Sequence, residues 1–167
     1  MATISKESVE TILVYTVLVF LFLAQIALYL SGLGTDWYGS LTISSSASLE
    51  SGTIQWIITY LLSVGGFLLV RDSDGIGFLI GLTVLGMVLT VLWDVLFFYA
   101  RDILLALIVQ FAVTSIYALV VFAVWNKTRN VAATILQIPI LLRSYYLFYQ
   151  TVILFLDNSG ETKIRPL

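Results

Sequence analysis

Long apolar stretches separated by short charged clusters make up almost the whole chain. A helix that crosses a bilayer needs about 20 mostly apolar residues. Stretches of this kind, with at most one charge each, predict five helices at about 11–31, 52–70, 75–99, 102–125 and 130–156. The apolar residues form continuous runs and do not alternate with polar ones, which favours helices over the strands of a membrane barrel.

The connections between these helices predict a compact bundle. One connection is long, the Ser-rich loop at about 32–51, and the others are short. Short connections favour antiparallel packing of neighbouring helices. We therefore predict an all-α integral membrane protein, a five-transmembrane-helix bundle that forms a single membrane domain over residues 1–167 and has the lipid bilayer as its surroundings.

Composition excludes several other classes of protein. Hydrophobic residues make up 60% of the chain and charged residues 11%, whereas about a quarter of a soluble domain is charged. The net charge of −2, with no basic stripe, argues against a nucleic acid partner. The chain has no His and no Cys, the commonest zinc and haem ligands and frequent catalytic groups. We predict no metal site, no required cofactor and no catalytic residues.

Two charges interrupt the predicted helices, Asp94 in the third and Arg143 in the fifth. Each costs about 2.5–3.5 kcal/mol at the centre of a membrane helix, so each should face the bundle interior. The helical rise places Asp94 about 28 Å and Arg143 about 20 Å from the side on which both helices start. An extended Arg side chain covers much of that gap, so we expect an ion pair. The alternative is a proton or anion site in a cavity.

Aromatic residues recur at helical spacing. Trp56 and Tyr60 share one helix face, and Trp93 and Phe97 share another. Ordinary core packing explains such pairs, and so does an aromatic-lined pocket for a flat apolar ligand.

Glycine and proline add two expectations about the helices. Gly77 and Gly81 form a small-residue pattern in the third helix, and Gly65–Gly66 lie in the second, and both predict close helix packing. Pro139 is expected to kink the fifth helix and to open space near Arg143.

Four segments occur in an order that resembles the translocator protein / tryptophan-rich sensory protein family (TspO/MBR). They are WYGSL at Trp37–Leu41, WIITY at Trp56–Tyr60, LWDVLFF at Leu92–Phe98 and IPILLR at Ile138–Arg143. The chain departs from the family pattern by lacking the prolines of the long loop. It also has Thr90, Val95, Ile140 and Arg143 where the family has Asn, Pro, Tyr and Trp, so it resembles a divergent member.

The resemblance implies a pocket enclosed by five helices, covered by the first loop, that binds a porphyrin or a sterol-like molecule in a sensory or transport-related role. Positions that match the family motifs, with neighbouring aromatic and charged residues, are the candidate ligand-binding residues: Trp37, Tyr38, Trp56, Tyr60, Thr90, Trp93, Asp94, Pro139, Arg143 and Tyr146. Arg143 suits a bidentate contact with a tetrapyrrole propionate. The loss of Trp at this position argues against the porphyrin degradation reported for some members.

Two other functions fit the sequence. A non-catalytic subunit or assembly factor of a membrane complex also consists of helices with few loops. A small ion- or proton-coupled transporter would use Asp94 and Arg143. We further expect a multi-pass protein in the cell membrane of a prokaryote, able to form a homodimer.

Overall fold

The structure, a computed structural model, describes residues 6–43 and 52–159, with side chains from residue 16 in the first range and from residue 55 in the second. Every long element is helical. The elements are α1 (Lys6–Leu33), α2 (Asp36–Gly39), α3 (Gly52–Leu68), α4 (Ile76–Asp94), the π-helix η1 (Val95–Tyr99), α5 (Ile103–Thr128) and α6 (Val131–Ser159).

The five predicted helices correspond to α1, α3, α4 with η1, α5 and α6. The predicted ends are within a few residues of those observed, except that α1 already begins at Lys6. The long loop differs from the prediction, because it starts with the short helix α2. The Thr35 hydroxyl caps α2 by accepting a hydrogen bond from the Tyr38 amide at 3.3 Å. Residues 44–51 of the predicted loop lie outside the described residues.

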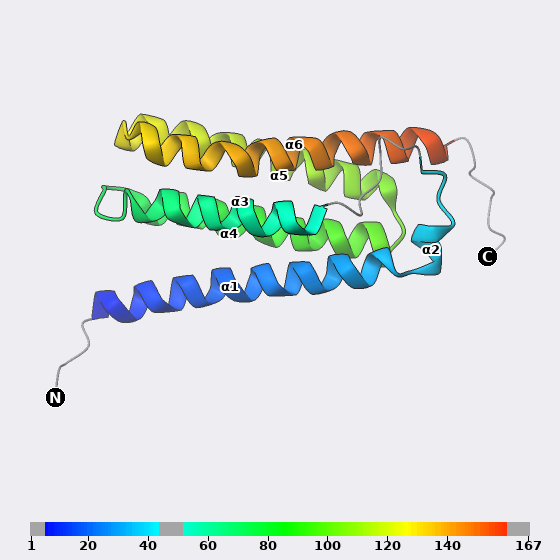
Figure 1. The fold of residues 1–167 in the computed structure, drawn as a ribbon, viewed down its shortest axis with the longest axis horizontal. Coiled ribbons are helices and arrows are strands. Elements are labelled where there is room, and N and C mark those ends of the chain that lie inside the picture. The colour runs from blue at the N-terminus through cyan, green and yellow to red at the C-terminus, as the bar shows by residue number, and fades with distance from the viewer. Residues whose placement is uncertain (1–5, 44–51, 160–167) are drawn as a thin grey trace.

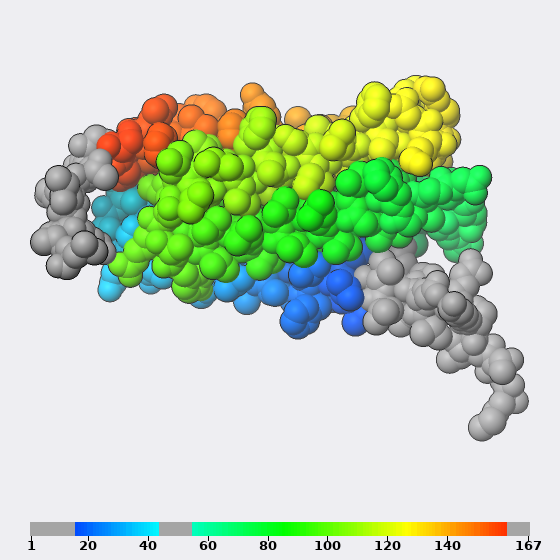
Figure 2. Space-filling view, turned by 180° about the vertical axis from the view of Figure 1, so that it is seen from behind, coloured from blue at the N-terminus to red at the C-terminus, as the bar shows by residue number. Residues whose placement is uncertain are grey.

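The helices form an antiparallel bundle with one loosely joined seam. Helices α1, α4 and α6 run in one direction, and α3 and α5 run in the other (Figure 1). Close backbone contacts join α3 to α6, α6 to α5, α5 to α4 and α4 to α1, whereas α1 and α3 make few of them. On the face of the bundle that is seen from behind, side chains of α4 and α5 lie closely against one another (Figure 2). The seam between α1 and α3 is therefore the most loosely packed boundary.

Four of the helical segments are long and apolar enough to cross a membrane: Thr16–Leu33, Ile76–Tyr99, Ile103–Thr128 and Val131–Ser159. Helix α3 is shorter, with a described apolar stretch of Gln55–Leu68. Its 17 residues measure about 25 Å at the helical rise, slightly less than the roughly 30 Å of a hydrocarbon core.

Close helix packing occurs at Gly66, one of the two adjacent glycines that the sequence singles out in the second predicted helix. A Cβ at Gly66 of α3 would lie 2.5 Å from Gln137 Nε2 and 3.0 Å from the Ala133 carbonyl oxygen on α6. The prediction of close packing at Gly77 and Gly81 is wrong, because both lie on the exposed face of α4 with open space at the Cβ position. Helix α6 continues through Pro139 to Ser159 without a break.

Candidate functional site

Three of the candidate residues meet where α2 packs on η1. Trp93 is fully buried and stacks on Phe97, with 5.0 Å between the ring centroids. Trp37 meets the same Phe97 ring edge-on at 5.2 Å, and Tyr38 meets Phe98 at 5.8 Å. These rings pack against one another, so Trp37, Tyr38 and Trp93 belong to the hydrophobic core at this end of the bundle.

A buried polar group links α1, α3 and α5 at the centre of the bundle. The Tyr60 hydroxyl donates to Gln25 Oε1 at 3.0 Å and lies 3.3 Å from the Tyr117 hydroxyl. Thr90 is fully buried, and its hydroxyl donates to the Gly86 carbonyl one turn earlier on α4 at 2.8 Å. Thr90 is thus satisfied within its own helix, while Tyr60 joins α3 to α1 and α5.

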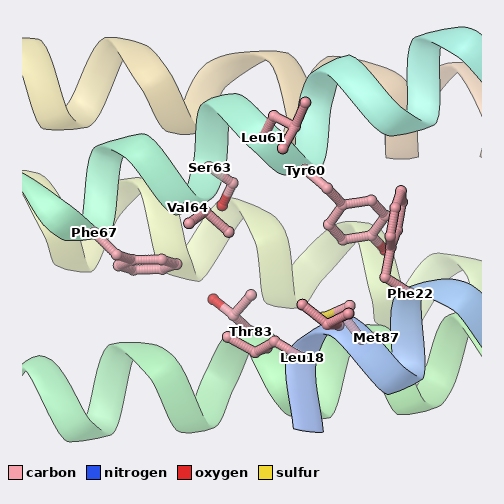
Figure 3. A pocket seen from close by; sticks show the side chains of 10 residues that line it. Leu18, Phe22, Tyr60, Leu61, Ser63, Val64, Phe67, Thr83 and Met87 are labelled. Atoms are coloured by element: carbon pink, nitrogen blue, oxygen red, sulfur yellow. The ribbon is translucent and has the colours of Figure 1, made fainter. Parts of the chain in front are cut away.

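An apolar cavity of about 170 Å³ lies between α1, α3 and α4. Phe67 stands at one end, and Tyr60 with Phe22 stands at the other (Figure 3). The lining residues are Leu18, Val19 and Phe22 from α1, Tyr60, Leu61, Ser63, Val64 and Phe67 from α3, and Thr83 and Met87 from α4. Of the ten candidate residues, only Tyr60 lines it. The other residues that line the cavity are ordinary apolar and small polar residues, and no signal in the sequence distinguishes them from residues of a packed core.

A second hollow, a groove of about 400 Å³, lies between α3 and α6. Three candidate residues, Pro139, Arg143 and Tyr146, line it together with Gln55, Thr59 and Leu142. The Arg143 guanidinium carbon lies 4.7 Å from the centroid of the Trp56 ring and 5.9 Å from that of Tyr146. Trp56 in turn stacks on Tyr60 at 5.4 Å. Trp56 and Tyr60 therefore lie between the groove and the cavity.

Asp94 and Arg143 are both buried, as predicted, with 0% and 5% of their surfaces exposed. The predicted ion pair is wrong. Neither Asp94 oxygen has a hydrogen-bond partner among the described residues, and neither do Nε and Nη1 of Arg143. The guanidinium is held against Trp56 and has Tyr29 as its hydrogen-bonding neighbour. The two charges act on each other only through a longer electrostatic interaction.

The apolar helices and the burial of both intramembrane charges define a multi-pass integral membrane protein of the α-helical class. The family model of TspO/MBR matches residues 13–156. The chain belongs to the TspO/MBR family, whose members have five transmembrane helices. A comparison with curated proteins finds no match. The resemblance drawn from the four ordered segments is thus confirmed, and so is the five-helix fold.

Proposed function

We propose that this protein binds a hydrophobic small molecule inside its helical bundle, in a sensory or transport-related role. The observation that supports this most directly is the apolar cavity between α1, α3 and α4. It lies at the seam where α1 and α3 make few backbone contacts. A ligand dissolved in the bilayer therefore has a route into the bundle that does not require tightly packed helices to separate.

Cavity size limits how much of a ligand fits without movement. Apolar cavities of roughly 150 Å³ hold a single benzene-sized ring, and sites for drug-sized molecules usually measure about 300–1,000 Å³. The observed volume of about 170 Å³ thus suits one ring or an alkyl segment. A porphyrin or sterol-like ligand, the kind that the family suggests, requires α1 and α3 to move apart.

Such a ligand would be held by contacts other than His or Cys ligation of a metal, because the chain contains neither residue. Aromatic side chains near the cavity, Phe22, Tyr60 and Trp56, offer flat surfaces for stacking. The proposal requires no cofactor. The homodimer, the prokaryotic cell membrane and the alternative functions as a complex subunit or transporter stay predictions.

Titration with protoporphyrin, followed by quenching of Trp fluorescence in the purified protein, tests the proposal. Val64→Phe adds bulk to the cavity lining and should weaken binding about tenfold or more. Val88→Phe makes the same change at an outward-facing residue of α4 that is 44% exposed, and this variant should bind like wild type. The absence of saturable quenching in wild type, with both protoporphyrin and a fluorescent sterol tested, would contradict the proposal.

A further inference from the structure

Arg143 is a buried cation whose donors are only partly used. Its Nε and Nη1 atoms have no hydrogen-bond partner in the described part of the chain. Removing a charged donor from water without giving it an acceptor costs free energy. The rest of the guanidinium interacts with the protein, through a hydrogen bond with Tyr29 and through the Trp56 ring, whose centroid lies 4.7 Å from the guanidinium carbon. Both atoms are shielded within the bundle, so an acceptor in the groove that Arg143 lines would remove the remaining cost by drawing the guanidinium towards it.

The groove beside Arg143 determines what kind of molecule can supply that acceptor. Arg143 lies about 18 Å along α6 from Val131 at the helical rise, deep within the bilayer. The exposed lining residues Leu142 and Tyr146 indicate that the groove opens towards lipid. Strongly hydrated inorganic anions do not enter hydrocarbon readily. The anion must therefore be attached to a hydrophobic body that partitions into the bilayer.

The shape of the guanidinium favours a carboxylate. Arg binds carboxylates with two parallel hydrogen bonds in one plane, and the rings of Trp56 and Tyr146 restrict the plane of this side chain. Asp94 is buried and has no hydrogen-bond partner among the described residues, so it does not occupy the Arg143 donors. The site thus still has cationic donors to offer.

We propose that the groove between α3 and α6 binds the carboxylate of a hydrophobic acid through Arg143. This site shares no lining residue with the cavity between α1, α3 and α4. The two sites can therefore be tested separately, and one can fail while the other stands. The polar groove residues Gln55 and Thr59 lie at the α3 edge of the site.

The first test compares 1-pyrenebutyric acid with its methyl ester, measured by energy transfer from Trp to pyrene in the full-length protein. We expect wild type to bind the acid more tightly than the ester. Arg143→Met keeps a long flexible side chain but removes the charge, and should reduce acid affinity about 10- to 100-fold with little change for the ester. The acid-to-ester ratio, compared between variants, cancels differences in partitioning of the two probes.

Arg129→Met is the matched control. Arg129 also lies over a Trp ring, that of Trp125 at 5.3 Å, but at the end of α5 and outside the groove. Its acid-to-ester ratio should equal that of wild type. Arg143→Lys keeps a cation but removes the planar fork that would form two parallel hydrogen bonds, so it should lower the acid-to-ester ratio several-fold. This variant keeps the proposal testable if Arg143→Met does not fold.

Equal binding of acid and ester by wild type would overturn the proposal, as would an acid-to-ester ratio unchanged in Arg143→Met. Neither result bears on protoporphyrin quenching and its loss in Val64→Phe, so failure here is distinct from failure of the proposed function. Competition with oleate and with protoporphyrin then identifies the hydrophobic body. Displacement by oleate indicates a straight-chain acid, displacement by protoporphyrin indicates a planar one, and displacement by neither overturns the proposal.

Discussion

Asn158 pairs with the backbone of Thr42, 116 positions earlier in the chain. Its Oδ1 accepts the Thr42 N–H at 3.0 Å, and its Nδ2 donates to the Thr42 carbonyl at 3.1 Å. The amide thus satisfies one backbone donor and one acceptor together, as a neighbouring strand would. This pair attaches the segment after α2 to the last turns of α6, next to the aromatic core around Trp93.

Replacing Asn158 should release this attachment. Asn158→Ala removes both hydrogen bonds to Thr42 and the bond from Nδ2 to the Leu154 carbonyl, and because the pair is partly exposed we expect a loss of about 1–2 kcal/mol in the free energy of unfolding. Thermal unfolding followed by circular dichroism in detergent measures it. Asp157→Asn, a change at the exposed neighbouring residue, should have little effect. Equal melting temperatures for Asn158→Ala and wild type would show that the pair contributes nothing.

Gly66→Ala should separate α3 from α6. The added methyl would lie 2.5 Å from Gln137 Nε2 and 3.0 Å from a backbone oxygen, and backbone cannot move aside cheaply. Overpacking of this kind costs about 1–3 kcal/mol. Gly77→Ala is the control, since a Cβ there meets open space and alanine favours helix by up to about 1 kcal/mol. If both variants unfold at the same temperature, α3 and α6 are less closely packed than the structure shows.

Arg101→Gly should stabilise the protein. Arg101 has a φ of 61° between η1 and α5, and a non-glycine residue in this left-handed region costs about 1–2 kcal/mol. Greater freedom of glycine in the unfolded chain offsets part of the gain, so we expect a net increase near 1 kcal/mol in the free energy of unfolding. Arg71→Gly, at a residue without positive φ, should give no increase. A lower melting temperature for Arg101→Gly would contradict the expectation.

The hydrogen bond between Tyr60 and Gln25 should be measurable as a coupling between α3 and α1. Tyr60→Phe removes the donor and leaves Gln25 Oε1, which is buried, without it. A double-mutant cycle with Gln25→Leu should give a coupling of about 0.6–1.7 kcal/mol, the range found for polar contacts within membranes. A coupling within experimental error of zero would indicate that the hydroxyl finds another partner, such as Tyr117 at 3.3 Å.

Much of the fold follows from the sequence because membrane insertion depends on local composition. Each apolar run of sufficient length must form a helix in hydrocarbon, since only a helix satisfies its backbone within one segment. Burial of Asp94 and Arg143 follows from the same cost of exposing charge to lipid. The order of the motif segments also identified the family, and the match over residues 13–156 confirms it.

The candidate site was predicted less completely, because residues with the same composition can line a hollow or fill a core. The motif residues Trp37, Tyr38 and Trp93 pack against one another, whereas Pro139, Arg143 and Tyr146 line the groove. The cavity is lined mostly by residues such as Leu18, Val64 and Met87, which look like any other helix surface in the sequence. What separates these groups is the spacing between helices.

The sequence by itself determined the class of protein, the five helices and the position of each charge along its helix, because these depend on the order of residues along one chain segment. Only the tertiary structure decided that Asp94 and Arg143 do not pair and that α1 and α3 stay loosely joined. Those outcomes depend on how each helix is rotated and on which side chains come between them. In this protein the Arg143 side chain contacts the Trp56 ring and Tyr29, and no periodicity in the sequence predicts those contacts.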